Sequence, residues 1–309
     1  MSVSGWIDRR TLREVVELIL LPGMALLLPW RLCFPFYRWL AGHDWLYRGE
    51  THAALAAAAS EGLVREPRDW ARAYRLMRLV DHADLYLSRF RGRRWMRRHV
   101  EVQSGAWPES GGPFLAITFH WGSGLWGLRH MRQSGRPAAV LVRDIPASLF
   151  AGRPVLARYA DLRTRETAAA GGGGVIYATA MSLVRIRRRF REGGNVVALL
   201  DVPPDEGEKH LECEFLGQRA AFPRGLIHLA VSEKMPVVVY DVSLDRETGK
   251  RVLNIDRLGR IADEEALLAI LVARLEAMIR RDPPSWHHWP GVTAFFRTAG
   301  MAEASAVHA

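Results

Sequence analysis

Residues 114–124 have the sequence Phe-Leu-Ala-Ile-Thr-Phe-His-Trp-Gly-Ser-Gly. The mostly apolar run at 114–119 follows Gly-Gly-Pro and predicts a buried strand, while residues 123–131 predict the start of a helix. His120 therefore stands at the carboxyl end of a strand, in a small turn that contains glycine. Open α/β sheets bind ligands at that edge. We interpret His120 as a candidate general base.

Short apolar runs and helical stretches go on alternating along the chain to residue 281. This alternation predicts an α/β core with a mixed, mainly parallel central sheet flanked by helices. The further strand candidates are residues 138–142, 175–178, 195–200 and 236–244. The helix candidates are residues 147–159, 181–191, 224–232 and 263–281. Residues 51–100 have a helical pattern and are expected to cover the sheet.

The four consecutive glycines at 171–174 lack the Gly-Lys-Ser/Thr of a phosphate loop, so we expect a flexible loop there.

The chain is basic, with 43 Lys and Arg against 33 Asp and Glu among its 309 residues and a formal net charge of +10. Arginines cluster at residues 9–13, 91–98 and 185–191, which favours an anionic partner such as nucleic acid, anionic lipid or an acidic carrier protein. No nucleic-acid recognition motif accompanies them, so no nucleic-acid partner is expected. Cys33 and Cys213 are too few for a disulfide framework and lack zinc-site spacing, which favours a reducing compartment.

The amino-terminal segment, residues 15–30, is strongly apolar and has arginines on both sides. Its uninterrupted portion is shorter than the roughly 20 residues that span a bilayer, and it contains Pro22 and Pro29. We predict a shallow or re-entrant membrane anchor over residues 1–48, with Arg, Trp and Tyr at an anionic bilayer interface. The alternative is a buried hydrophobic helical hairpin. An α/β domain is expected at 49–299, with a helical cover at 49–110 and the sheet core at 111–299, followed by a disordered tail at 300–309.

Polar residues follow other apolar runs as His120 follows the first. Arg143 and Asp144 come after the run at 138–142, Asp201 comes after the run at 196–200, and Arg224 precedes a helix. The carboxyl ends of parallel strands meet at one edge of a sheet, so we expect these side chains to share a cleft with His120. Each one singly also has a structural explanation, as a helix cap or a surface ion pair.

The chain resembles the lysophospholipid acyltransferase superfamily, and most closely the lipid A late acyltransferases, which add lauroyl or myristoyl groups at the inner membrane. The resemblance covers most of the chain. The stretches that carry it are residues 120–124, 193–201, 215–221, 236–240 and the Trp- and His-bearing stretch 282–289. It implies an enzyme at the cytoplasmic face of a bacterial inner membrane. That enzyme would move a fatty acyl group from the thioester of acyl carrier protein, or of coenzyme A, to a hydroxyl of a membrane lipid or glycolipid, with no other cofactor. Lipid A, another glycolipid, an ornithine-type lipid and an aryl-polyene-type lipid all stay open as acceptors.

The resemblance also implies roles for the residues of the cleft. His120 would deprotonate the acceptor hydroxyl, and backbone N–H groups of Gly122 and Ser123 would stabilise the oxyanion. Ser123 as an acylated nucleophile is disfavoured, because the chain lacks a Gly-x-Ser-x-Gly elbow here. Arg143 and Arg224 would bind phosphate groups, and the basic stretches at 91–98 and 185–191 would dock an acidic carrier protein.

No metal site is expected. Adjacent side chains such as His287 and His288 point apart on regular structure, and no third ligand has suitable spacing. We expect both histidines to pack near Trp286 and Trp289.

One position departs from the family pattern. There the histidine is followed five residues later by Asp or Glu, whose carboxylate holds the imidazole in one tautomer; here that residue is Leu125. Three interpretations follow. Asp144 or Asp201 supplies the carboxylate from another strand end, His120 works without an acidic partner at a reduced rate, or the chain is a non-catalytic lipid-binding or assembly protein on an acyltransferase fold.

Overall fold

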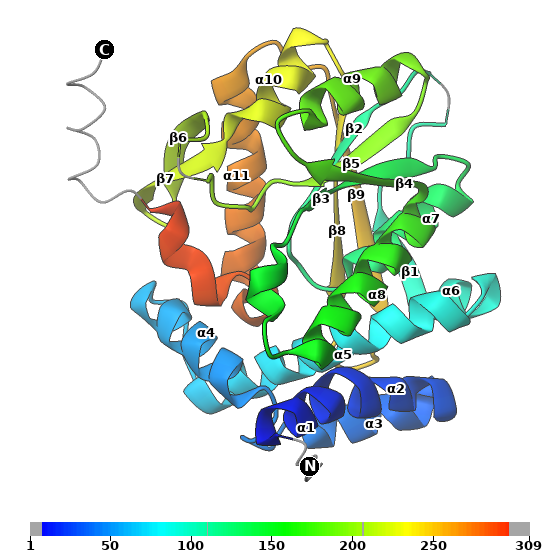
Figure 1. Cartoon of the computed structure of the whole chain (residues 1–309), viewed down its shortest axis with the longest axis vertical. Coiled ribbons are helices and arrows are strands. Elements are labelled where there is room, and N and C mark those ends of the chain that lie inside the picture. The colour runs from blue at the N-terminus through cyan, green and yellow to red at the C-terminus, as the bar shows by residue number, and fades with distance from the viewer. Residues whose placement is uncertain (1–7, 110, 206, 297–309) are drawn as a thin grey trace, which may run out of the picture.

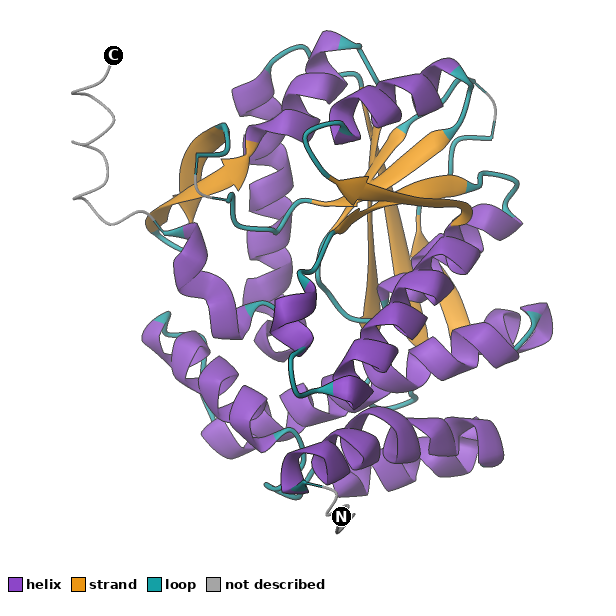
Figure 2. Cartoon of the chain, viewed as in Figure 1, coloured by secondary structure: helices purple, strands orange, loops and turns teal. Residues whose placement is uncertain are grey.

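The structure is a computed structural model that describes residues 8–109, 111–205 and 207–296. One seven-stranded sheet forms its centre, with helices packed around it and a separate two-stranded hairpin beside it (Figures 1 and 2). The strand order is β1-β9-β8-β2-β5-β3-β4. Strands β8, β2, β5, β3 and β4 are parallel, β9 is antiparallel to β8, and β1 is parallel to β9. The predicted mixed, mainly parallel sheet flanked by helices is confirmed.

The sheet strands are β1 (Val100–Ser104), β2 (Leu115–Thr118), β3 (Ala138–Arg143), β4 (Gly172–Ala178), β5 (Asn195–Leu199), β8 (Val237–Leu244) and β9 (Arg251–Gly259). The hairpin strands are β6 (His210–Phe215) and β7 (Gln218–Pro223). The α-helices are α1 (Arg9–Val15), α2 (Leu21–Leu27), α3 (Trp30–Leu40), α4 (Arg48–Ser60), α5 (Pro67–Phe90), α6 (Arg93–His99), α7 (Gly124–Gln133), α8 (Pro154–Gly171), α9 (Ser182–Arg191), α10 (Arg224–Ser232) and α11 (Glu264–Arg281). A π-helical turn, η1 (Val16–Leu20), joins α1 to α2, and three 3₁₀ turns are η2 (Ala147–Phe150), η3 (Pro283–Ser285) and η4 (Trp289–Phe295).

Helices cover both faces of the sheet, which explains why the central strands are continuous apolar runs. In β2, Ala116 packs in a core cluster with residues of α5 and α7. Its neighbours Leu115 and Ile117 pack in a second cluster with residues of α10 and α11. Successive side chains of a strand point to opposite faces, so a strand covered on both sides needs apolar residues at every position.

Two sequence predictions about local structure are wrong. The helix predicted over 147–159 is interrupted, because Pro154 starts a new helix, α8, in whose first turn a missing N–H costs nothing. The flexible loop predicted at 171–174 does not exist either. Gly171 ends α8, and Gly172 begins β4. A Cβ on Gly173 would lie 2.4 Å from the carbonyl carbon of Ala138, so glycine there lets β4 approach β3.

The amino-terminal segment folds onto the rest of the molecule. Helices α1 to α3 lie together at one end (Figure 1), and their inner side chains join the core cluster that reaches the sheet. Tyr37 is buried, and its hydroxyl donates to the carbonyl oxygen of Leu21 at 2.8 Å. No helix in the described part of the chain is long and apolar enough to cross a membrane. The shallow or re-entrant membrane anchor predicted over residues 1–48 does not require such a helix and stays a prediction. The predicted disordered tail at 300–309 lies outside the described residues.

Candidate active site

His120 and Asp201 are brought together by the register of two neighbouring strands. Thr118 at the end of β2 pairs with Leu199 at the end of β5. His120 and Asp201 each follow that pair by two residues, so the parallel strands deliver them side by side at the carboxyl edge of the sheet. Asp144 follows β3, which is separated from β2 by β5. Asp144 is exposed, and the structure does not bring it to His120.

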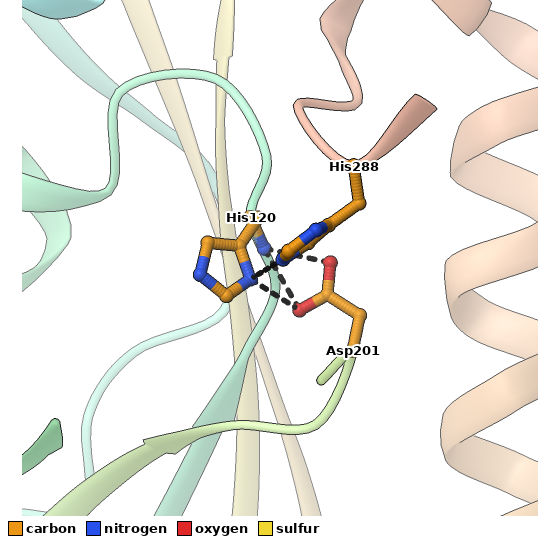
Figure 3. A group of neighbouring side chains, drawn as sticks. All are labelled: His120, Asp201 and His288. Atoms are coloured by element: carbon orange, nitrogen blue, oxygen red, sulfur yellow. Dashed lines mark hydrogen bonds and ion pairs between the residues drawn. The ribbon is translucent and has the colours of Figure 1, made fainter. Parts of the chain in front are cut away.

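Asp201 is fully buried and hydrogen-bonded on both oxygens (Figure 3). The His120 Nδ1 lies 3.1 Å from Oδ1, the His120 backbone N–H donates to both oxygens at 2.9 Å, and Trp286 Nε1 donates to Oδ2 at 2.8 Å. Burial alone raises the pKa of a carboxyl group. The interactions with His120, His288 and Trp286 outweigh that effect and hold the pKa of Asp201 below its ordinary value.

A segment near the carboxyl end of the described chain runs along the His120 turn. Gly122 N–H donates to the carbonyl of Ser285 at 3.1 Å, and His287 N–H donates to the carbonyl of His120 at 2.9 Å. This pairing places the Nε2 of His288 2.8 Å from the Nδ1 of His120, with the two rings edge to face (Figure 3). His288 was predicted to be a packing residue, and the Trp-His-His-Trp motif marked its segment but not this contact.

His287 holds the turn from the other side. The Nη1 of Arg78 lies 2.6 Å from His287 Nδ1, and a guanidinium can only donate, so Nδ1 accepts. The proton of His287 is therefore on Nε2, which donates to the carbonyl of Gly122 at 3.0 Å. Burial, reinforced by the charge of Arg78 and opposed by Asp81, lowers the pKa of His287 to about 3.

The Gly122–Ser123 turn is built tightly against β8. Gly122 has a φ of +53°, and a Cβ there would lie 1.9 Å from the carbonyl oxygen of Val242, so no other residue fits without rearrangement. Ser123 N–H donates to that same carbonyl at 3.0 Å, and Gly122 N–H is bound to Ser285. Both amides already have acceptors, which disfavours the predicted role of these two amides in stabilising an oxyanion. Within the described chain, the amides of Gly124 and Leu125 at the start of α7 have no acceptor.

The two predicted phosphate-binding arginines are each paired with a carboxylate. Arg143 lies at the cavity described below and contacts Asp205 at 2.7 Å. Arg224 makes a two-pronged contact with Glu264, at 2.6 and 3.1 Å, and does not line that cavity. Arg224 is therefore part of a structural ion pair outside the cavity, whereas Arg143 lies at the cavity next to His120.

A cavity of about 700 Å³ opens beside His120, within the size range of small-molecule sites. Helices α5, α7 and α8 and the strand ends enclose it. Its apolar wall includes Leu125, Leu128, Val140, Val197 and Tyr240. Its polar wall includes Arg78, Asp81, Arg163, Thr164 and His287. Arg78 and Arg163 could not be predicted as site residues, because they lie mid-helix in an arginine-rich chain and nothing local distinguishes them.

The geometry at His120 suits proton transfer. Its Nδ1 faces Asp201 and His288, and the other ring nitrogen, Nε2, points away from both (Figure 3). About a third of the side chain is exposed, at 36%, and His120 lines the cavity. An imidazole whose Nδ1 proton is held by a buried carboxylate offers a lone pair on Nε2, which is the arrangement a general base needs.

His120, Asp201 and His288 also place three possible metal-ligand atoms within 4.8 Å of one another. Two imidazoles and a carboxylate are ligands that divalent transition metals accept. Hydrogen bonds from His120 and Trp286 already satisfy both oxygens of Asp201. The geometry therefore favours acid–base chemistry over metal binding at this group.

Comparison with models of known protein families gives no match for this chain, and comparison with curated protein sequences gives none. The class that the fold and the site define is an α/β protein with a histidine–aspartate pair at the carboxyl edge of its sheet, opening onto a largely apolar cavity.

Proposed function

We propose that the protein is a membrane-associated acyltransferase, similar to the lipid A late acyltransferases, with His120 as general base. It would transfer a fatty acyl group from a carrier-protein or coenzyme A thioester to a hydroxyl of a lipid or glycolipid at the cytoplasmic face of a bacterial inner membrane. The observation that carries the proposal is the His120–Asp201 pair at the wall of a cavity with one apolar side. An acyl chain needs such a wall, and the hydroxyl it joins needs such a base.

The proposed reaction uses His120 twice. Its Nε2 takes the proton of the acceptor hydroxyl as the oxygen attacks the thioester carbonyl, and Asp201 stabilises the resulting imidazolium. The tetrahedral intermediate then collapses with cleavage of the carbon–sulfur bond, and the leaving thiolate takes the proton back from Nε2. The free amides of Gly124 and Leu125, at the positive end of α7, border the same cavity and supply donors for the oxyanion. The Ser123 side chain is fully buried, which disfavours it as a nucleophile.

Helix α9 is the better of the two basic stretches for docking an acidic carrier protein. Ser182 and Leu183 in its first turn line the cavity, and Arg185, Arg188 and Arg191 are exposed on it. Helix α6 instead packs on β1, at the edge of the sheet opposite to β4. A carrier on α9 would stand next to the cavity, where its thioester is needed.

The alternative is a non-catalytic lipid-binding or assembly protein, which Leu125 motivated. Asp201 occupies the place at His120 Nδ1 that the missing acid would otherwise fill. This contact favours the catalytic proposal, because a protein that only binds lipid has no need of a buried carboxylate on that imidazole.

The test is an acyl-transfer assay on membranes with labelled acyl carrier protein or acyl-coenzyme A as donor and mass spectrometry of the lipids. We expect wild-type protein to form an acylated lipid, and His120→Gln to lower its rate by about 10²–10⁴-fold. The matched control is His52→Gln, an exposed histidine on α4, which should leave the rate unchanged. Undiminished product with His120→Gln would remove the histidine mechanism. Lipid binding without product from any form would establish the alternative.

A further inference from the structure

We propose that His288 is a positioning residue of the active site. Together with Asp201 it keeps the proton of His120 on Nδ1, so that Nε2 faces the cavity as the base. This inference rests on the proposed role of His120, and it assigns a part of the machinery to a segment 168 residues further along the chain. His288 touches His120 and is not placed against the reacting atoms.

The position of His288 is fixed by backbone pairing. Residues 285–287 run antiparallel to the His120 turn, with an isolated bridge between Trp121 and Trp286 and the two hydrogen bonds that flank it. Trp286 is buried and donates to Asp201 from the same segment. The chain that delivers His288 to Nδ1 of His120 therefore also orients the carboxylate that shares this nitrogen.

Proton counting decides which way the histidine pair is bonded. The Nδ1 of His120 carries at most one proton, and it has two neighbours, Asp201 Oδ1 at 3.1 Å and His288 Nε2 at 2.8 Å. An ionised Asp201 can only accept. If His288 donated from Nε2, the bare Nδ1 of His120 would face a carboxylate oxygen, and two lone pairs would meet. The stable arrangement has the proton on His120 Nδ1, shared between the carboxylate and a bare Nε2 of His288.

This arrangement requires a neutral His288. Burial favours that state first. The positive charges of Arg143 and Arg78 oppose protonation of His288 further, against the negative charge of Asp201. Trp286 and Phe295 pack around its ring. A neutral His288 can accept a share of the proton, which stabilises the imidazolium that forms when Nε2 of His120 takes the hydroxyl proton. The side chain of Leu125 cannot accept a hydrogen bond from His120. The carboxylate of Asp201 and the Nε2 of His288 both accept from Nδ1 instead.

The first test reads the tautomers directly. A long-range ¹H–¹⁵N spectrum of protein with ¹⁵N-labelled histidine shows which ring nitrogen carries a proton, with resonances assigned from His120→Gln and His288→Gln. We expect both His120 and His288 to be protonated on Nδ1 and bare on Nε2 at neutral pH. A packing residue has no reason to show this pair of states. A proton on Nε2 of His288 would overturn the proposal, and this result does not depend on enzymatic activity.

The second test separates positioning from packing in the acyl-transfer assay. His288→Phe keeps a flat ring but removes the acceptor, so we expect kcat to fall about tenfold with KM within about twofold. His288→Gln, whose amide oxygen can accept from Nδ1–H, should recover the rate to within about threefold. His52→Phe is the matched control, and unfolding curves confirm that the variants are folded.

An unchanged kcat in folded His288→Phe would contradict the proposal. If wild-type protein transfers no acyl group, the proposed function fails, and the tautomers still decide the role of His288.

Discussion

Leu125 is buried, with 6% of its surface exposed, and it lies with Leu128 in the apolar wall of the cavity. Placing an acid at position 125, as in the family pattern, should therefore lower the stability of the protein. Asp201 already holds Nδ1 of His120, so a carboxylate in Leu125→Asp would be buried without a partner, at a cost of about 1–3 kcal/mol or more. We expect lower stability in urea unfolding and a lower transfer rate. Leu125→Met, which conserves volume, should cost less than about 1.5 kcal/mol. A faster Leu125→Asp enzyme would show that position 125 can support His120.

The sequence predicted His120 and Asp201 as site residues but could not choose between Asp201 and Asp144. Both follow apolar runs, and the choice depends on strand order, which local pattern does not encode. Because β5 lies next to β2 and β3 does not, the carboxylate beside His120 comes from Asp201. Trp286 and His288 were missed for the same reason, since their contacts with Asp201 and His120 arise from tertiary pairing across 85 and 168 residues.

At the scale of elements, the segment that carries His287 and His288 should make the fold acid-sensitive. Burial first, then nearby positive charge, lowers the pKa of His287 to about 3 and that of His288 to about 4. Unfolded chains protonate histidine near pH 6.5. Between pH 6.5 and about 4 the unfolded state therefore binds more protons, and stability falls as pH falls, by at most about 1.4 kcal/mol per pH unit for each histidine.

Urea unfolding at pH 7, 6 and 5 measures this slope. Burial also lowers the pKa of His82, His99 and His130, and these histidines add to the slope in both proteins, so the informative comparison is with the double variant His287→Gln/His288→Gln. We expect the double variant to be less stable at pH 7 but to lose less stability on acidification. Equal slopes in the two proteins would show that this segment does not carry the acid sensitivity.

Elements with a clear pattern were predicted well, and those without one were not. The central strands β2 and β5 are mostly apolar and almost entirely buried because both faces of the sheet are covered, and helix α10 matches its predicted range. Strand β1 was missed because four of its five residues are exposed at an edge of the sheet. Strand β9 contains Arg251, Asp256 and Arg257, and neighbouring strands rather than its own composition make it extended.

At the scale of the whole molecule, one end combines exposed apolar and basic side chains. Leu27 is 83% exposed and Trp39 60%, and Leu12, Leu20 and Leu32 are more than half exposed on the same group of helices. Arg9, Arg10, Arg13, Arg31 and Arg38 are exposed among them. Helix α1 also contacts the start of α8 through Glu14 and Arg153, at 2.7 Å, close in the chain to the exposed Leu149. We propose that this end, α1 to α3, lies on an anionic bilayer surface without crossing it.

Sedimentation with vesicles of phosphatidylglycerol and phosphatidylethanolamine tests this surface. Burying one exposed leucine in the bilayer interface contributes about 1.5–3 kcal/mol, so Leu27→Glu/Leu32→Glu should weaken partitioning at least tenfold. Ile270→Glu is the matched control, because Ile270 is 41% exposed on α11, away from α1 to α3 (Figure 1), and should leave partitioning unchanged. Wild-type binding should weaken with added salt, since arginines at the surface attract the anionic headgroups.

Equal loss of vesicle binding in both variants would mean that hydrophobic exposure in general, rather than this end, attaches the protein. No loss in either would place the membrane contact elsewhere, and acyl transfer would then have to reach its lipid acceptor by another face.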